Sequence, residues 1–253
     1  MTNVIGTIDV AQIVLYAFWI FFFGLIFYLR REDRREGYPL VSDVGGVPEN
    51  PGAVWMPTPK SFVLASGRVT YAPRDDDPQP AINATPIDGT PGAPYEPNGD
   101  PMLAAFGPGA YAERPDEPDL SDEREPRIIP LRAAAGFFVA ERSVNPLGFP
   151  VFGADGVQAG TVSDIWVDRA ETLIRYFEVQ LPGGQTVLLP QTIADVDTRR
   201  GVVTVNAILA SQFANVPRIK GPDVVTLLEE DKIMGYYGGG YLFATPQRSE
   251  PLF

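Results

Sequence analysis

Carboxylates are the side chains with which this chain can do acid–base chemistry, because its 253 residues include no histidine and no cysteine. The missing histidine removes the commonest general base and the commonest transition-metal ligand. Without cysteine, neither a thiolate nucleophile, nor a thiolate metal site, nor a disulfide can form. The composition therefore predicts no catalytic residue and no metal site, and it argues against an ordinary hydrolase.

The densest group of carboxylates lies in residues 116–125, where six Asp or Glu side chains and one Arg occur in ten positions. Such a run concentrates hydronium near the protein surface, and repulsion among its charges favours protonation of some members. It can therefore collect protons. The alternative is a solvated acidic loop, which is the usual state of exposed charged residues.

The N-terminal segment is predicted to hold these carboxylates at a membrane. Residues 10–29 carry no charge, and a helix of that length spans about 30 Å, the hydrocarbon thickness of a bilayer. The segment lacks a basic start and an Ala-x-Ala cleavage site, which favours a retained membrane helix over a signal peptide. Four arginines follow it and none precedes it, which places residue 30 onward in the cytoplasm and residues 1–9 on the other side. They are Arg30, Arg31, Arg34 and Arg35.

The net charge of −12 falls entirely on the part after residue 40, because the first 40 residues contain four basic and four acidic side chains. A nucleic-acid partner would require a basic surface. The charge distribution therefore predicts no nucleic-acid binding.

Two regions of different composition follow the membrane helix. Residues 41–126 contain 16 Pro and 9 Gly, which is typical of irregular chain, although apolar islands interrupt it. We predict that residues 30–126 form an extended segment packed on partner proteins, with one short strand near Phe62–Leu64. From residue 127 to 219, β-rich runs alternate with turn signals and predict a small antiparallel barrel or sandwich. The runs are Phe149–Phe152, Thr161–Val167, Arg175–Leu181, Thr186–Leu189 and Val202–Val205.

Residues 220–253 are predicted to form a helix and a tail. Thr226 and Glu229 have the spacing of a capping box at a helix N-terminus. Three adjacent glycines, Gly238–Gly240, each cost a helix about 1 kcal/mol relative to Ala. They therefore predict either the helix end or a close approach of another backbone.

Seven short motifs resemble the H subunit of the photosynthetic reaction centre of purple bacteria. Each motif is modest by itself, but their shared order along nearly the whole chain is specific. They are Arg30–Leu40, Lys60–Leu64, Gly99–Met102, Ala133–Phe137, Asp164–Asp168, Leu227–Ile233 and Gly239–Ala244.

This resemblance implies a fold and a location. The fold is a single N-terminal transmembrane α-helix, a mainly-β cytoplasmic domain with a PRC-type β-barrel, and a C-terminal helix. Residues 1–9 are then periplasmic, and the chain crosses the bacterial inner (intracytoplasmic) membrane once.

The resemblance also implies an accessory, non-enzymatic subunit that binds no pigment itself. It caps and stabilises two pigment-binding core subunits and provides proton-transfer routes to the secondary quinone. The complex would hold bacteriochlorophyll, bacteriopheophytin, quinones and non-haem iron in those partners. Membrane lipids, a cytochrome subunit and a light-harvesting antenna are further candidate partners.

Site residues follow from the same resemblance. The family's most important carboxylate corresponds to Glu171, with Asp168 and Arg175 close to it in sequence. Some relatives carry proton-collecting histidines in the region of residues 116–125. Here, that proton entry is assigned to Asp122, Glu123 and Glu125. The arginines after the membrane helix are assigned to lipid head groups and partner acids. Without the resemblance, Glu171 would be taken as a solvated residue in a turn.

Two other functions stay open. One is a membrane-tethered PRC-barrel adaptor without a photosynthetic role, which would leave the membrane span and the Pro-rich segment unexplained. The other is a membrane-anchored enzyme, for which the sequence offers no catalytic constellation.

Overall fold

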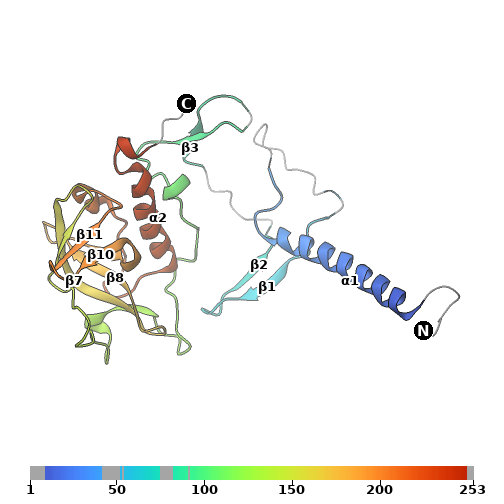
Figure 1. Cartoon of the computed structure of the whole chain (residues 1–253), viewed down its shortest axis with the longest axis horizontal. Helices are drawn as coiled ribbons and strands as arrows, with labels where there is room; N and C mark the ends of the chain where they lie inside the picture. The colour runs from blue at the N-terminus through green and yellow to red at the C-terminus, as the bar shows by residue number, and fades with distance from the viewer. Residues whose placement is uncertain (1–8, 42–51, 53, 75–81, 91, 250–253) are drawn as a thin grey trace. The chain divides into compact units, whose positions relative to one another are not determined.

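The computed structural model describes residues 9–41, 52, 54–74, 82–90 and 92–249 (Figure 1). These residues belong to two compact units, which are described separately. The first unit comprises Met1–Pro80 and Gly89–Gly92, and the second comprises Ala81–Asp88 and Ala93–Phe253. Of the predicted periplasmic segment, residues 1–8 lie outside the described residues.

The first unit begins with the predicted membrane helix. Helix α1 runs from Val10 to Glu32, and the Asp9 carboxylate caps it by accepting a hydrogen bond from the Gln12 amide at 2.9 Å. The helix continues three residues beyond the uncharged run, because arginines are good helix formers and their charges suit a helix C-terminus. A short 3₁₀ turn, η1 (Asp33–Arg35), follows it. The whole stretch is long and apolar enough to cross a membrane.

A β-hairpin completes the described part of this unit. Strands β1 (Lys60–Val63) and β2 (Val69–Ala72) pair antiparallel, and Gly67 adopts a positive φ of 83° in the turn. The sequence predicted a single strand here. The second strand was missed because Val69–Ala72 is short and lies close to several prolines.

The second unit is built around a seven-stranded sheet with the order β10-β11-β6-β7-β8-β9, in which β5 also pairs with β7. Every pair is antiparallel except β6 with β11. The mainly antiparallel β domain is therefore confirmed, with one parallel pair that was not expected. The strands are β5 (Ile128–Pro130), β6 (Pro150–Phe152), β7 (Gln158–Asp168), β8 (Leu173–Gln180), β9 (Thr186–Pro190), β10 (Ala194–Asp197) and β11 (Val202–Val205).

Smaller elements complete the second unit. A short hairpin, β3 (Ala84–Pro86) with β4 (Tyr95–Pro97), precedes the sheet. Five short 3₁₀ segments are also described in this unit. They are η2 (Gly107–Gly109), η3 (Leu131–Ala133), η4 (Gln191–Ile193), η5 (Ala210–Asn215) and η6 (Pro246–Arg248).

Strand β7 is the centre of the hydrophobic core. Ile165 and Trp166 are adjacent in sequence and therefore point to opposite faces, yet both are completely buried. The strand is thus covered on both sides, as its imperfect alternation of apolar residues predicted. Its last residue, Asp168, is a buried polar group at the strand end.

Helix α2 (Leu227–Phe243) packs on the sheet (Figure 1). The predicted capping box is confirmed, because Thr226 and Glu229 each accept a hydrogen bond from the other's backbone amide. The glycines lie where another backbone approaches closely. A Cβ atom at Gly239 would lie 3.0 Å from the Gly109 Cα, and one at Gly240 would lie 2.5 Å from the Ala207 carbonyl oxygen.

Candidate functional site

The register of two strands brings Arg127 to the end of β7. Ile128, the first residue of β5, pairs with Asp168, the last residue of β7. Arg127 directly precedes β5, and its carbonyl accepts a hydrogen bond from the Arg169 amide at 2.9 Å. Its guanidinium therefore lies among the acids around this strand end.

Arg127 bridges three carboxylates. Its Nε and Nη2 atoms each lie 2.9 Å from an oxygen of Asp168, and Nη2 also lies 2.5 Å from Oε1 of Glu171. The third partner is Asp119, at 3.3 Å from Nη1. These four residues are called the Arg127 cluster. A planar guanidinium suits this arrangement, because its five N–H groups point in fixed directions.

Asp168 is the buried member of the cluster, with 1 % of its surface exposed. Its Oδ1 atom accepts hydrogen bonds from the backbone amides of Ala170 and Glu171, which shapes the turn between β7 and β8. Burial opposes ionisation, but the hydrogen bonds from Arg127 and these amides outweigh it and lower the pKa of Asp168. At neutral pH this group is therefore a fixed negative charge.

Glu171 is the accessible member, with 51 % of its side chain exposed. It lies in the turn that Asp168 holds, so water can reach its carboxylate while Arg127 fixes its position. Arg175, which was expected to pair with these acids, lies on β8. Among the described residues, the arginine that pairs with both Asp168 and Glu171 is Arg127.

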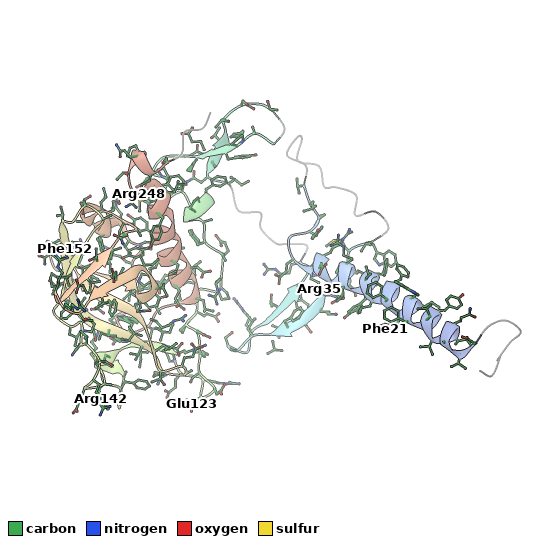
Figure 2. The ribbon with its side chains drawn as sticks, viewed as in Figure 1. Phe21, Arg35, Glu123, Arg142, Phe152 and Arg248 are labelled. Carbon is green, nitrogen blue, oxygen red and sulfur yellow. The ribbon has the colours of Figure 1, made fainter. Side chains whose placement is uncertain are left out.

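The predicted proton entry lies on a loop that starts and ends at the cluster. The Arg127 amide donates a hydrogen bond to the Asp119 carbonyl at 2.8 Å and so closes the loop 119–127. Glu123 lies at its outer edge (Figure 2) and accepts a hydrogen bond from the Ser121 hydroxyl. Glu125 pairs with Arg169 at 2.7 Å. Asp122 lies beside them in the same loop, so all three predicted acids are close in sequence to the cluster.

A cavity of about 420 Å³ opens beside the Arg127 cluster. We call it the Asp168 pocket, because its wall includes Asp119, Arg127 and Asp168. Residues of β8 and α2 also line it, namely Arg175, Tyr176, Glu230 and Asp231, and Arg114 contributes as well.

Glu230 is a functional candidate that sequence reasoning missed. Its residue is 8 % exposed, and its Oε2 atom accepts a hydrogen bond from the Tyr176 hydroxyl at 2.7 Å. In the sequence it stands in the first turn of a helix, where acids are common because of the helix dipole. Because the helix dipole already explains an acid at this position, nothing in the sequence indicated a buried side chain there. Arg127, Asp119 and Tyr176 were missed as well, because no local pattern links them to Glu171.

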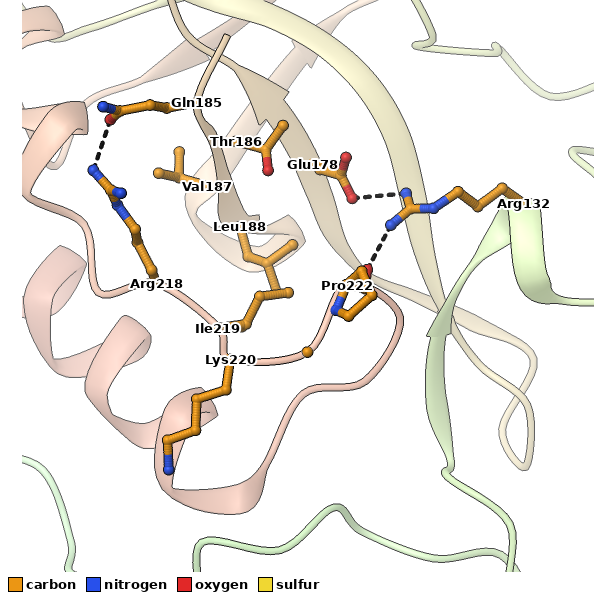
Figure 3. A pocket seen from close by; sticks show the side chains of 11 residues that line it. Arg132, Glu178, Gln185, Thr186, Val187, Leu188, Arg218, Ile219, Lys220 and Pro222 are labelled. Carbon is orange, nitrogen blue, oxygen red and sulfur yellow. Dashed lines mark hydrogen bonds and ion pairs between the residues drawn. The ribbon is translucent and has the colours of Figure 1, made fainter.

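A second ion-pair network surrounds Arg132, close to another cavity of about 370 Å³ (Figure 3). Arg132 lies 2.8 Å from Asp164 and 2.9 Å from Glu178, and it also donates a hydrogen bond to the Pro222 carbonyl. Glu178 additionally accepts from the Trp166 indole at 3.0 Å. These contacts tie the η3 turn to β7, β8 and the segment before α2, which indicates a structural role.

The arginines after the membrane helix differ in their surroundings. Arg35 is 10 % exposed at its side chain and pairs with Glu32 at 2.8 Å. It also donates hydrogen bonds to the carbonyls of Thr58 and Ala72, beside the ends of the β1–β2 hairpin (Figure 2). Arg34 donates to the Val54 carbonyl. Arg30, paired with Asp33 at 3.8 Å, is 73 % exposed at its side chain. Arg31 is half-buried.

We expect Arg35→Ala to loosen the hairpin. The substitution removes the Glu32 ion pair and both hydrogen bonds to the hairpin ends, so the turn should open more often. Limited trypsin digestion of the full chain in mild detergent should then cleave after Arg68 several-fold faster. Arg30→Ala is the matched control, because an exposed pair contributes little. Equal cleavage rates in the two variants would contradict the stabilisation of the hairpin by Arg35.

Two models of known protein families match this chain. The model described as the photosynthetic reaction centre, H-chain N-terminal region, matches residues 2–133, and the model of the PRC-barrel domain matches residues 138–212. The first match covers more than half of the chain, so the protein belongs to the photosynthetic reaction centre H-chain family. It is therefore a single-pass membrane subunit that associates with other reaction-centre subunits.

Within the described residues, no group of three or more acidic side chains has the arrangement needed to hold a metal ion. The carboxylates of the Arg127 cluster are directed at a guanidinium instead.

Proposed function

We propose that this subunit caps two pigment-binding core subunits on the cytoplasmic side of the membrane and provides a proton route to the secondary quinone. The observation that carries the proposal is the Arg127 cluster. It joins an exposed acidic loop to a buried aspartate and an accessible glutamate, beside a cavity. Residues 30–126 supply much of the contact with the partners, and the subunit has no catalytic site of its own.

The chemistry of quinone reduction explains why such a route is needed. A quinone that takes up two electrons must also take up two protons, and a buried quinone can receive them only through side chains and water. Carboxylates can carry protons when their surroundings allow both charge states. In the absence of histidine, they are the groups in this chain suited to work near neutral pH.

Each acid has its own role in this route. Asp122, Glu123 and Glu125 attract protons to the loop. Glu171 passes them on, because it is accessible to water and held in place by Arg127. Asp168 stays ionised, so it holds the cluster together and positions the turn that carries Glu171.

The arginines that follow α1 lie on the cytoplasmic side of the bacterial inner membrane, and residues 1–9 lie in the periplasm. Arg30 and Arg31 contact lipid head groups and acids of the core subunits. Arg34 and Arg35 contribute mainly by fixing the segment that leaves the membrane. Arg175 acts on the acids of the Asp168 pocket through its charge.

Glu171→Gln tests the proposal in assembled reaction centres. The amide cannot carry a proton, so proton uptake coupled to the second reduction of the quinone should slow about tenfold. General acid–base groups typically contribute more than this, but water can partly replace a half-exposed side chain. Flash-induced electron transfer, with a pH-indicator dye to follow proton uptake, measures the effect.

Glu141→Gln is the matched control, because Glu141 is an exposed glutamate outside the Arg127 cluster. The control should leave the rate within twofold of the wild type. The same rate in Glu171→Gln and the control would overturn the assignment of Glu171.

A further inference from the structure

Glu230 is a buried acid that the route through the acidic loop does not use. It is the fourth residue of α2, and it lines the Asp168 pocket together with Asp168 and Arg127. The Tyr176 hydroxyl is its hydrogen-bond donor, at 2.7 Å, and both residues are more than nine-tenths buried. A carboxyl group in such a position needs an explanation, because burial of an acid is costly unless it is fully paired or neutral.

The neighbouring residue shows that burial on this turn does not by itself imply a function. Glu229 is 5 % exposed, and its two oxygens accept hydrogen bonds from the backbone amides of Thr226 and Lys220. It therefore completes the helix cap. Glu230 accepts no backbone hydrogen bond of the cap among those described; its described partner is the Tyr176 hydroxyl, and it lines the Asp168 pocket.

The Asp168 pocket has room for several water molecules. Its volume of about 420 Å³ far exceeds the roughly 30 Å³ that one water molecule occupies in the liquid. Its wall offers many polar partners for water, including Asp119, Arg127 and Asp168. Water in this pocket can therefore connect Glu230 with the Arg127 cluster by hydrogen bonds.

We propose that Glu230 is a second proton carrier, which exchanges protons with water in the Asp168 pocket and so supplies the Arg127 cluster independently of the acidic loop. This inference rests on the proposed proton route. In one cycle, the neutral carboxyl group of Glu230 releases its proton to a pocket water. The resulting carboxylate keeps the hydrogen bond from Tyr176 and later regains a proton from solvent water.

The charges around Glu230 suit both of its protonation states. Burial and the nearby Asp119 raise the pKa of Glu230, while the Tyr176 hydroxyl, Arg175 and Arg114 partly offset this. The other charged groups that line the pocket are Asp231 on the same helix, Arg127 and Asp168. Burial also raises the pKa of Tyr176, so this phenol keeps its proton and remains a donor. The pKa of Glu230 is thus displaced upward, whereas that of Asp168 is displaced downward.

The test compares Glu230→Gln with Glu229→Gln in assembled reaction centres. Both substitutions change a buried glutamate on the same turn to its amide, and glutamine is compatible with the capping box at position 229. Proton uptake coupled to the second reduction of the quinone should slow about tenfold in Glu230→Gln and stay within twofold in Glu229→Gln. Equal rates in these two variants would overturn the inference.

Glu171→Gln, measured in parallel, separates this inference from the proposed route. If Glu171→Gln slows proton uptake and Glu230→Gln behaves like Glu229→Gln, the second carrier is excluded and the main route stands. If neither variant slows it, both proposals fail. Slow uptake in both Glu171→Gln and Glu230→Gln supports the second carrier. Slow uptake in Glu230→Gln alone would contradict delivery of its proton to the Arg127 cluster and would overturn the inference.

Tyr176→Phe tests the role of Glu230 through the pH dependence of the rate of proton uptake. A purely structural role of Glu230 would leave that pH dependence unchanged. The phenol donates to the charged form of Glu230, so its removal should raise the pKa of Glu230 further. The rate of proton uptake should fall with rising pH as Glu230 loses its proton, and in Tyr176→Phe this fall should begin at a higher pH. An unshifted pH profile in an assembled variant would contradict the role of Glu230.

Discussion

Arg127→Met is expected to lower the free energy of unfolding of the chain by about 2 kcal/mol at neutral pH. Asp168 is 1 % exposed and would lose its guanidinium partner. Removal of one member of a fully buried ion pair typically costs 3–5 kcal/mol, because the other charge is left uncompensated. The expected loss is smaller here because a quarter of the Arg127 side chain is exposed. Chemical denaturation of the full chain in mild detergent, followed by circular dichroism, measures it.

The pH dependence of this difference has a definite sign. Arg127 lowers the pKa of Asp168 in the folded chain. The resulting stabilisation is present above the unfolded pKa of about 4 and is lost as the pH falls through the folded pKa. The gap between wild type and Arg127→Met should therefore be widest at neutral pH and shrink below about pH 4.

A second substitution separates the lost charge pair from lost packing. Asp168→Asn removes the buried charge but keeps an oxygen that can accept from the turn amides. The double variant Arg127→Met/Asp168→Asn should therefore recover part of the stability lost in Arg127→Met. A double variant less stable than Arg127→Met would contradict the ion-pair explanation.

The long elements of this fold were predictable because their signals are local. The uncharged run predicted α1, and the Thr226–Glu229 capping box predicted the start of α2. Helix α1 nevertheless extends to Glu32, because charged arginines can continue a helix beyond its apolar run. Strands β5 and β10 were missed, because Ile128–Pro130 has three residues and Ala194–Asp197 alternates small and acidic side chains.

The candidate site was predictable only in part, because its contacts connect distant positions. Glu171 and Asp168 were predicted as site residues from the resemblance of sequence motifs to a known family. In the structure they lie in one turn. Their arginine is 41 residues from Asp168 in sequence and reaches it through the β5–β7 register. Tyr176 and Glu230 are 54 residues apart. A single sequence contains no local pattern that reveals either pairing, whereas Arg175, four residues from Glu171, looked like the partner.

Gly240→Ala is expected to destabilise the chain by about 1–2 kcal/mol, although alanine is the better helix former. The new Cβ would lie 2.5 Å from both the Ala207 carbonyl oxygen and the Ile208 Cγ2 atom. Neither backbone can yield easily, because Arg248 donates hydrogen bonds to the carbonyls of both Ala207 and Gly240 at 2.8 Å. Overpacking of this kind typically costs 1–3 kcal/mol and exceeds the roughly 1 kcal/mol gained in helix propensity.

Gly238→Ala, two residues earlier on the same helix, is the matched control for this prediction. Its Cβ would meet one atom within 4 Å, the Pro108 carbonyl oxygen at 3.2 Å. The free-energy cost of a small backbone shift there and the gain in helix propensity offset each other. The free energy of unfolding should therefore stay within about 0.5 kcal/mol of the wild type. Thermal unfolding of the full chain, followed by near-ultraviolet circular dichroism, compares the two variants. A Gly240→Ala variant as stable as Gly238→Ala would show that α2 and residues 207–208 can separate, and would contradict the close backbone packing of this helix.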